Sequence, residues 1–128
     1  MIKYKIIPRK NPSDRSLAAK FYVSPIHSGV VDLDRLSELI SDGSTLREGD
    51  IHNVLLGMVI AISQQLADGR LVKLGKLGSF SISLNSEGAE KEEEAGAQLI
   101  KRAKIRYRPS ARLKDLLKTL HFGKYKAK

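Results

Sequence analysis

The segment from Thr45 to Gly69 constrains the fold more than any other part of the chain. Thr45 and Glu48 have the spacing of a capping box, in which each side chain satisfies an unpaired amide at a helix start. Leu56 and Ile60 widen the apolar surface beyond one stripe, so the helix has to be covered on more than one side, by its own core or by a dimer partner. The main stripe consists of Ile51, Val54, Leu55, Met58, Val59, Ile62 and Leu66.

Two shorter patterned segments flank this helix. Before it, residues 32–40 carry leucine and isoleucine at helical spacing, and Gly43 is placed to stop a helix. After it, residues 71–84 predict two strands joined by a tight reversal between Gly75 and Gly78. The second of these strands alternates Phe, Ile and Leu with serine, as a strand with one buried face does.

Residues 99–108 predict a third strand, in which apolar and basic side chains alternate. Ala103, Ile105 and Tyr107 share one face. Like charges in a row repel one another, so such a row is either solvated or neutralised by phosphate groups. We interpret it as a surface for a polyanion. The basic side chains of the other face are Arg102, Lys104, Arg106 and Arg108.

A last helix is expected after this strand. Pro109 interrupts the strand, Ser110 can cap a helix, and Gly123 is placed to stop it. A basic tail follows at residues 124–128. Between the second and third strands, residues 85–98 are polar, acidic and free of proline, which predicts a flexible arm.

The first 30 residues predict an extension with one or two short strands. Ile2–Ile7 alternates apolar residues with lysine until Pro8, and Phe21–Val23 can form a second strand before Pro25. We expect the first of these strands to join the sheet of the later strands or to cover its edge.

The net charge of +9 is concentrated at the two ends of the chain. Residues 1–24 carry +5 and residues 99–128 carry +10, whereas residues 25–98 carry −6. Residues 25–84 alone carry −2, and such a nearly balanced middle beside a concentrated basic end indicates a surface that meets polyanions.

Other classes of protein lack support in the sequence. There is no cysteine for a disulfide, a thiolate or a metal site, and Val54–Ile62 is far shorter than the roughly 20 apolar residues of a membrane span. His27, His52 and His121 belong to no catalytic or metal-binding motif. We expect a non-enzymatic cytoplasmic protein with no cofactor, no metal, no small-molecule substrate and no membrane partner.

Two motifs in the predicted hairpin and third strand resemble a known family. Residues 72–80 are similar to its hydrophobic–Gly–Phe–Gly–x–Phe signature, with Leu77 at the aromatic position. Residues 106–115 are similar to its aromatic–basic–Pro segment, which ends in Leu-Lys-Asp. Over about residues 32–121 the chain resembles the HU/IHF family of bacterial histone-like DNA-binding proteins, in a variant subgroup with an N-terminal extension.

This resemblance implies an α+β fold with two N-terminal helices, a three-stranded antiparallel sheet with an arm, and a C-terminal helix, in an intertwined dimer. It implies an extension at residues 1–30, an HU-like DNA-binding domain at residues 31–123 with its arm at 85–98, and a basic tail at 124–128. The implied function is architectural, non-sequence-specific binding of double-stranded DNA in the bacterial nucleoid. We expect a homodimer, with a heterodimer as the alternative.

In such a dimer, two copies of the basic strand form a cationic saddle for a duplex. Contacts of lysine and arginine with phosphate position a protein on DNA but do not read its sequence. Because the arm is acidic and lacks the family's wedging proline, the alternative is a protein-interaction module that has kept the fold and lost DNA binding. The expected phosphate contacts are Lys101, Arg102, Lys104, Arg106 and Arg108 on the strand, Arg112 and Lys114 on the last helix, and Lys73 and Lys76 in the hairpin.

Overall fold

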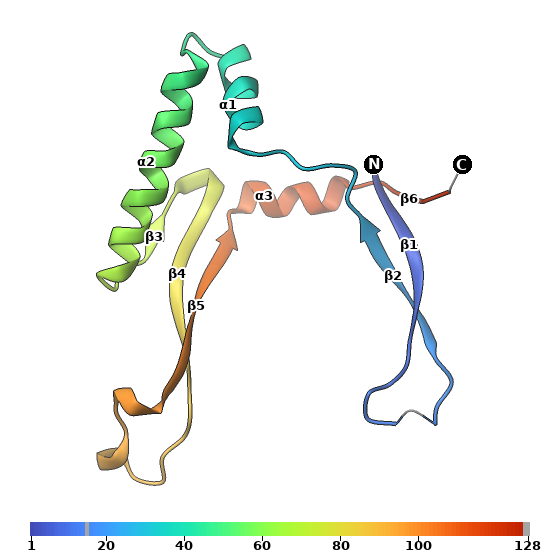
Figure 1. The fold of residues 1–128 in the computed structure, drawn as a ribbon, viewed down its shortest axis with the longest axis vertical. Helices are drawn as coiled ribbons and strands as arrows, with labels where there is room; N and C mark the ends of the chain where they lie inside the picture. Colours follow the sequence, from blue (N-terminus) through green and yellow to red (C-terminus); the bar gives the residue numbers. More distant parts are fainter. Residues whose placement is uncertain (15, 127–128) are drawn as a thin grey trace. The chain divides into compact units, whose positions relative to one another are not determined.

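The computed structural model describes residues 1–14 and 16–126 (Figure 1). Within these residues the protein has three α-helices and two three-stranded sheets, which confirms the predicted α+β class. The chain forms two compact units. One consists of residues 1–32 together with 117–128, and the other of residues 33–116.

The larger unit begins with two helices, α1 (Leu33–Asp42) and α2 (Glu48–Ala67). Gly69 ends α2 as predicted, with a φ of 81° that favours glycine. Its N–H donates to the carbonyl of Leu66, and the next N–H donates to the carbonyl of Gln65. These two bonds form a Schellman motif, which satisfies the last carbonyl groups of the helix.

The predicted capping box before α2 is wrong. The N-cap residue is Arg47, whose side chain makes no capping bond, and Glu48 is the first helical residue. The loop between the helices is held instead by serines. The Ser41 hydroxyl donates to the carbonyl of Leu46 at 2.9 Å, and the Leu46 N–H donates to the Ser44 hydroxyl at 3.2 Å. These bonds keep Leu46 outside the helix, so α2 begins later than the motif requires.

The second sheet of the protein belongs to the same unit and has the order β3-β4-β5. Its strands are antiparallel: β3 (Val72–Lys73), β4 (Gly78–Ser86) and β5 (Ile100–Pro109). A short 3₁₀ turn joins the first two, with Gly75 at φ 57° and Gly78 at φ 128°. A Cβ atom at Gly78 would overlap the carbonyl oxygen of Arg108. Glycine at that position therefore lets the turn lie directly against β5.

Side-chain bonds tie this turn to the end of β5 and to helix α3 (Ala111–Leu116). The Tyr107 hydroxyl donates to the carbonyl of Leu77 at 2.6 Å, and the Ser110 hydroxyl donates to the carbonyl of Lys76. Ser110 also accepts the N–H of Leu113 at 3.4 Å, which confirms its predicted role as the helix cap. The turn, the strand end and the helix start are thus one connected structure.

The predicted arm lies between β4 and β5, after a bulge at Asn85 and Ser86. It contains two short 3₁₀ turns, Glu92–Glu94 and Ala97–Leu99. The Gln98 side-chain amide donates to the carbonyl of Glu94 at 2.8 Å, so the arm has hydrogen bonds of its own.

The smaller unit contains a separate sheet of order β2-β1-β6. In it β1 (Ile2–Arg9) pairs antiparallel with β2 (Lys20–Ile26) and parallel with the short β6 (Phe122–Lys124). The first alternative, that this strand joins the sheet of the later strands, is therefore wrong. The second alternative, that it covers the edge of that sheet, stays a prediction. Gly123 lies inside β6 and does not stop the last helix, which also corrects the prediction.

Two prolines lie within the strands of this sheet. Pro8 was expected to end β1, yet the strand continues to Arg9. Pairing with β6 reaches only from Ile2 to Tyr4, so Pro8 lies where β1 has β2 as its one neighbour. Pro25 lies in β2, at the edge of the sheet. Both positions tolerate a residue without an N–H donor.

The predicted domain boundaries stay predictions. The three helices and the strands β3, β4 and β5 lie within residues 33–116, whereas residues 117–123 of the expected HU-like domain belong to the smaller unit.

The apolar core of the described chain is small. Ile51 and Leu66 are its only buried hydrophobic side chains, at 5% and 7% exposure. Val54, Ile60 and Ile105 are more than 60% exposed. A single chain therefore leaves apolar surface of α2 and of its sheet in contact with water.

Candidate nucleic-acid interface

The register of β4 and β5 places the predicted cations on one face of the sheet. Directly opposed residues of an antiparallel pair share a face. Each of the four cations is opposed by a hydroxyl or an amide side chain, and we call these cations the basic row. The pairs are Arg102 with Asn85, Lys104 with Ser83, Arg106 with Ser81, and Arg108 with Ser79.

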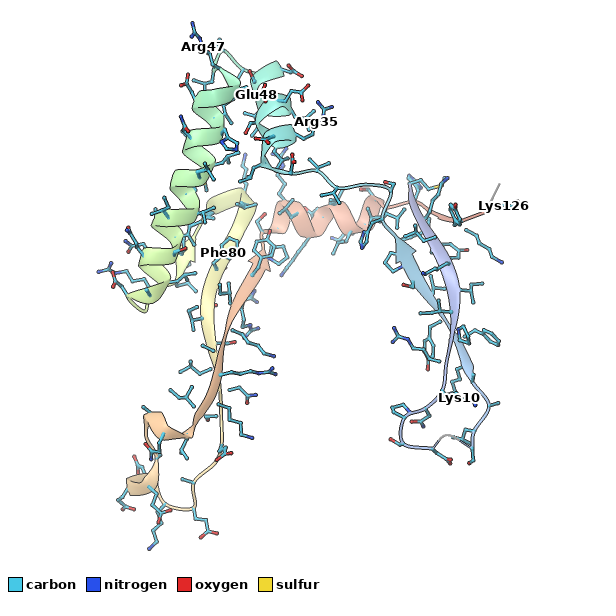
Figure 2. The ribbon with its side chains drawn as sticks, in the orientation of Figure 1. Lys10, Arg35, Arg47, Glu48, Phe80 and Lys126 are labelled. Atoms are coloured by element: carbon cyan, nitrogen blue, oxygen red, sulfur yellow. The ribbon has the colours of Figure 1, made fainter. Side chains whose placement is uncertain are left out.

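The other face of the same strands is apolar, which confirms the predicted alternation of the third strand. Ala103, Ile105 and Tyr107 are opposed by Leu84, Ile82 and Phe80. The rings of Phe80 and Tyr107 lie 5.1 Å apart, between their centroids, in a tilted contact. Figure 2 labels Phe80 and shows side chains leaving β4 and β5 on both sides.

The charge of the basic row is not compensated within the described protein. All four side chains are exposed, and no carboxylate among residues 1–14 and 16–126 forms an ion pair with them. Neighbouring cations on one strand face repel one another, and an anion relieves that repulsion. The row is therefore suited to a ligand with regularly repeated negative charge.

Lys73 extends this face by one strand. It is opposed by Ser79, which in turn is opposed by Arg108, so the three side chains form a line across β3, β4 and β5. A shallow hollow on the same face is lined by Lys73, Arg106 and Arg108 together with serines of β4. The structure thus brings five of the nine predicted residues together: Lys73, Arg102, Lys104, Arg106 and Arg108.

The other four predicted residues lie outside this face. Lys101 lies at the bulge, and its ammonium group pairs with the Glu87 carboxylate at 3.6 Å. Lys76 belongs to the 3₁₀ turn, whereas Arg112 and Lys114 are exposed on α3. Because Lys101 already has an acidic partner, its charge is less available to a ligand than that of the row.

Sequence reasoning missed the polar half of this face. Ser79, Ser81, Ser83 and Asn85 present small hydrogen-bonding groups beside the cations. Their alternation was visible in the sequence, but the pairing of each serine with a cation depends on the strand register.

The described residues do not form a metal-binding cluster around the histidines. The His52 side chain lies 3.0 Å from the Asp34 carboxylate and links α2 to α1. Within the described ranges, no three His, Cys, Asp or Glu side chains are grouped as a metal site. None of the helices described there has the length and apolar composition needed to cross a membrane.

The exposed row of cations on a small antiparallel sheet is the main electrostatic feature of this basic α+β protein. The chain belongs to the HU-HIG family, whose members contain an HU domain fused to a winged helix-turn-helix, an Ig or a glycine-rich motif; the match covers residues 1–124. This confirms the predicted relationship to HU proteins. A comparison with curated proteins gives no match.

The fold is also similar to a solved crystal structure from Bacteroides vulgatus, described as that of a candidate bacterial DNA-binding protein. The TM-score is 0.62 at 12% sequence identity, so the likeness concerns the fold alone. The match covers 96% of this chain and 47% of the other, so this chain spans about half the length of that protein.

Proposed function

We propose that this protein binds double-stranded DNA without sequence specificity, as an architectural protein of the bacterial nucleoid. The observation that carries this proposal is the basic row, whose four cations are exposed and have no acidic partner in the described chain. Membership of an HU-domain family and the fold shared with a candidate bacterial DNA-binding protein support it.

The chemistry of the face favours phosphate contacts over base reading. Lysine and arginine bind the phosphate backbone of any sequence, and the serine hydroxyls beside them can donate to phosphate oxygens. Binding then releases counterions, so affinity falls steeply as salt is added.

We propose that the active form is a homodimer, with residues 33–116 of each protomer in the intertwined arrangement of HU proteins. The exposed apolar surface of α2 and of the sheet supports association, because Val54, Ile60 and Ile105 would remain in water in a single chain. Folding is then coupled to dimerisation. A two-fold axis would double the basic row and give a duplex two strips of cations.

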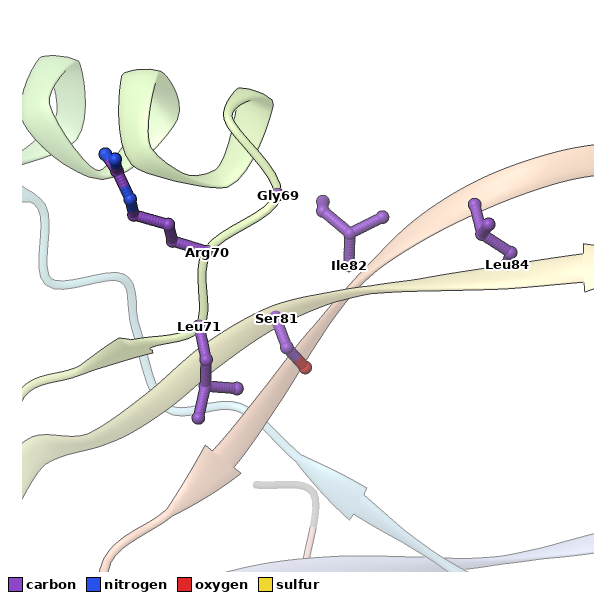
Figure 3. Close-up of a pocket in the computed structure, with 6 residues that line it drawn as sticks. All are labelled: Gly69, Arg70, Leu71, Ser81, Ile82 and Leu84. Carbon is purple, nitrogen blue, oxygen red and sulfur yellow. The ribbon is translucent and has the colours of Figure 1, made fainter.

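An unfilled hollow supports the same arrangement. It lies between the end of α2 and strand β4, and its lining includes Leu71, Ile82 and Leu84 (Figure 3). Figure 3 shows Ile82 and Leu84 on the helix side of β4, with Ser81 on the other side. Ile82 is 41% and Leu84 59% exposed, so apolar side chains of a partner can be accommodated there.

The decisive experiment is a binding titration with short duplexes of random sequence at several salt concentrations. We expect wild-type affinity to fall about a thousandfold between about 50 and 200 mM salt, as roughly six phosphate contacts require. The variant Arg102→Glu/Lys104→Glu/Arg106→Glu should lose binding. Its matched control is Arg35→Glu/Arg47→Glu/Arg70→Glu, which changes the net charge equally, away from the row.

The second candidate function is a protein-interaction module that has kept the fold and lost DNA binding. The acidic arm favours it, because Glu87 pairs with Lys101, one of the expected phosphate contacts. Absence of any complex between wild-type protein and duplex DNA at low salt would favour this candidate and overturn the first.

A further inference from the structure

The positive charge of the protein is concentrated in the unit that does not contain the basic row. Residues 1–32 and 117–128 hold ten basic and two acidic residues, a net charge of +8. Residues 33–116 hold thirteen basic and twelve acidic residues, a net charge of +1. The smaller unit therefore supplies most of the attraction that the protein exerts on a polyanion at a distance.

The pairing of β1 with β2 sorts these charges onto one face. Lys5 is opposed by Ser24, Ile7 by Tyr22, and Arg9 by Lys20, and all these residues share the face of Lys3. The opposite face carries Tyr4, Ile6 and Pro8, opposed by Pro25, Val23 and Phe21. We call the first of these the hairpin face; its cations are Lys3, Lys5, Arg9 and Lys20.

A hollow at the loop end of this hairpin gathers cations around an aromatic ring. Arg9, Lys10, Lys20 and Tyr22 line it, together with residues of the connecting loop. Tyr22 is 47% exposed, so its ring is open to a ligand. A cluster of lysine and arginine side chains is the electrostatic footprint of a nucleic-acid-binding surface.

The acidic residues of the unit do not neutralise the hairpin face. Asp14 accepts hydrogen bonds from the N–H and the hydroxyl of Ser16, and these bonds lower the pKa of its carboxyl group. Asp32 is the only other acidic residue of the unit. Within the described ranges, none of the four face cations forms an ion pair with a carboxylate.

We propose that the hairpin face is a second phosphate-binding surface, which contacts duplex DNA in addition to the basic row. This inference rests on the proposed function. Each cation of the face that contacts a phosphate adds about 0.9 to the slope of log affinity against log salt concentration. Two surfaces in one chain thus share the binding energy, and the unit that contains the hairpin face has the larger net charge.

The first test measures the salt slope of the full-length protein on random-sequence duplexes. The variant Lys5→Gln/Arg9→Gln/Lys20→Gln should make the dependence on salt less steep, by about 2 to 3 in the slope, and should weaken binding at low salt. The control Arg47→Gln/Arg70→Gln/Lys91→Gln removes the same charge from the other unit and should leave the slope within about 0.5 of wild type. The charge-conserving variant Lys5→Arg/Arg9→Lys/Lys20→Arg should restore wild-type binding.

The second test requires no substitution. Lysine acetylation of the wild-type protein, read by mass spectrometry, should show Lys5 and Lys20 protected by bound duplex and Lys91 unprotected.

The inference is overturned if the hairpin variant has the salt slope of its control and if Lys5 and Lys20 of the wild-type protein are unprotected in the complex. That result would leave the proposal for the basic row in place. The inference is also overturned if the hairpin variant keeps its DNA binding but loses binding to duplex RNA or to anionic vesicles. Wild-type protein that binds no DNA defeats the proposed function itself.

Discussion

The hydroxyl of Tyr107 donates a hydrogen bond to the carbonyl of Leu77 at 2.6 Å. The bond joins the strand that carries the basic row to the glycine turn before β4, so it fixes the end of the row. We expect Tyr107→Phe to lower the free energy of unfolding by about 0.5–1.5 kcal/mol. Urea denaturation at one fixed protein concentration measures this. Tyr22→Phe is the control, since the Tyr22 hydroxyl forms no hydrogen bond within residues 1–14 and 16–126.

Gly78 is the most constrained glycine of the turn. An alanine Cβ would overlap the Arg108 carbonyl, at a φ of 128° that side chains rarely adopt. Gly78→Ala should therefore destabilise the protein by about 2–4 kcal/mol. Gly49→Ala in α2, where a Cβ meets nothing within 4 Å, should be neutral or stabilising by up to about 1 kcal/mol. Thermal unfolding of both variants checks the contrast, and equal melting temperatures would contradict it.

Carboxylates placed opposite the basic row should compete with DNA. Ser81→Asp/Ser83→Asp faces Arg106 and Lys104 directly and leaves every cation in place. If both cations become paired, the steepness of the salt dependence falls by about 1.8, so the affinity at about 50 mM salt falls roughly tenfold more than the affinity at about 200 mM. Ser44→Asp, in the loop between α1 and α2, adds a carboxylate at a distance from the row. Fluorescence anisotropy measures both, and equal effects at the two places would refute the local competition.

A charge on the exposed surface of α2 should break the proposed dimer. Ile60 is 61% exposed in the single chain, and a partner would bury it. Ile60→Glu should raise the dimer Kd at least about 30-fold, the equivalent of about 2 kcal/mol. Sedimentation equilibrium measures the change. Val30→Glu, at a position 93% exposed, should sediment as wild type does.

The hairpin loop offers a pH test of its own geometry. The Ser16 hydroxyl is the largest cause of the lowered pKa of Asp14, so Ser16→Ala should raise that pKa toward 3.8. A lowered folded-state pKa stabilises the loop above the unfolded value, and this stability is lost as pH falls through the folded value. Carbon-detected NMR of the carboxyl group follows the titration. Ser13→Ala should leave it unchanged, because Ser13 bonds Asn11 through its backbone N–H.

Local patterns predicted the elements whose residues contact their own neighbours in sequence. The helix over residues 48–67 and the alternating strand that became β5 follow directly from periodicity, because side-chain direction repeats every 3.6 or two residues. The stop at Gly69 follows from the left-handed conformation that glycine adopts without strain.

Much of what the sequence did not predict depends on pairing between segments that are far apart in the chain. Strand β6 pairs Phe122 with Ile2, at opposite ends of the chain, and nothing in the three-residue segment around Gly123 indicates that partner. The same holds for the site, where the Ser81–Arg106 pair required the strand register.

The prediction of a capping box was wrong for a different reason. Its spacing is necessary for the motif, but Ser41 and Ser44 compete for the backbone groups of the same loop.

The unpaired charge of the basic row gives dissolved ions two opposing roles. Ions screen the repulsion among Arg102, Lys104 and Arg106 and so favour the folded sheet, yet in the proposed complex they would compete with the duplex for those same side chains. If the proposed complex forms, the duplex replaces these ions, and we expect it to raise the melting temperature of the protein most at low salt. The free sheet is therefore expected to be least stable at low salt, where the proposed complex would be tightest.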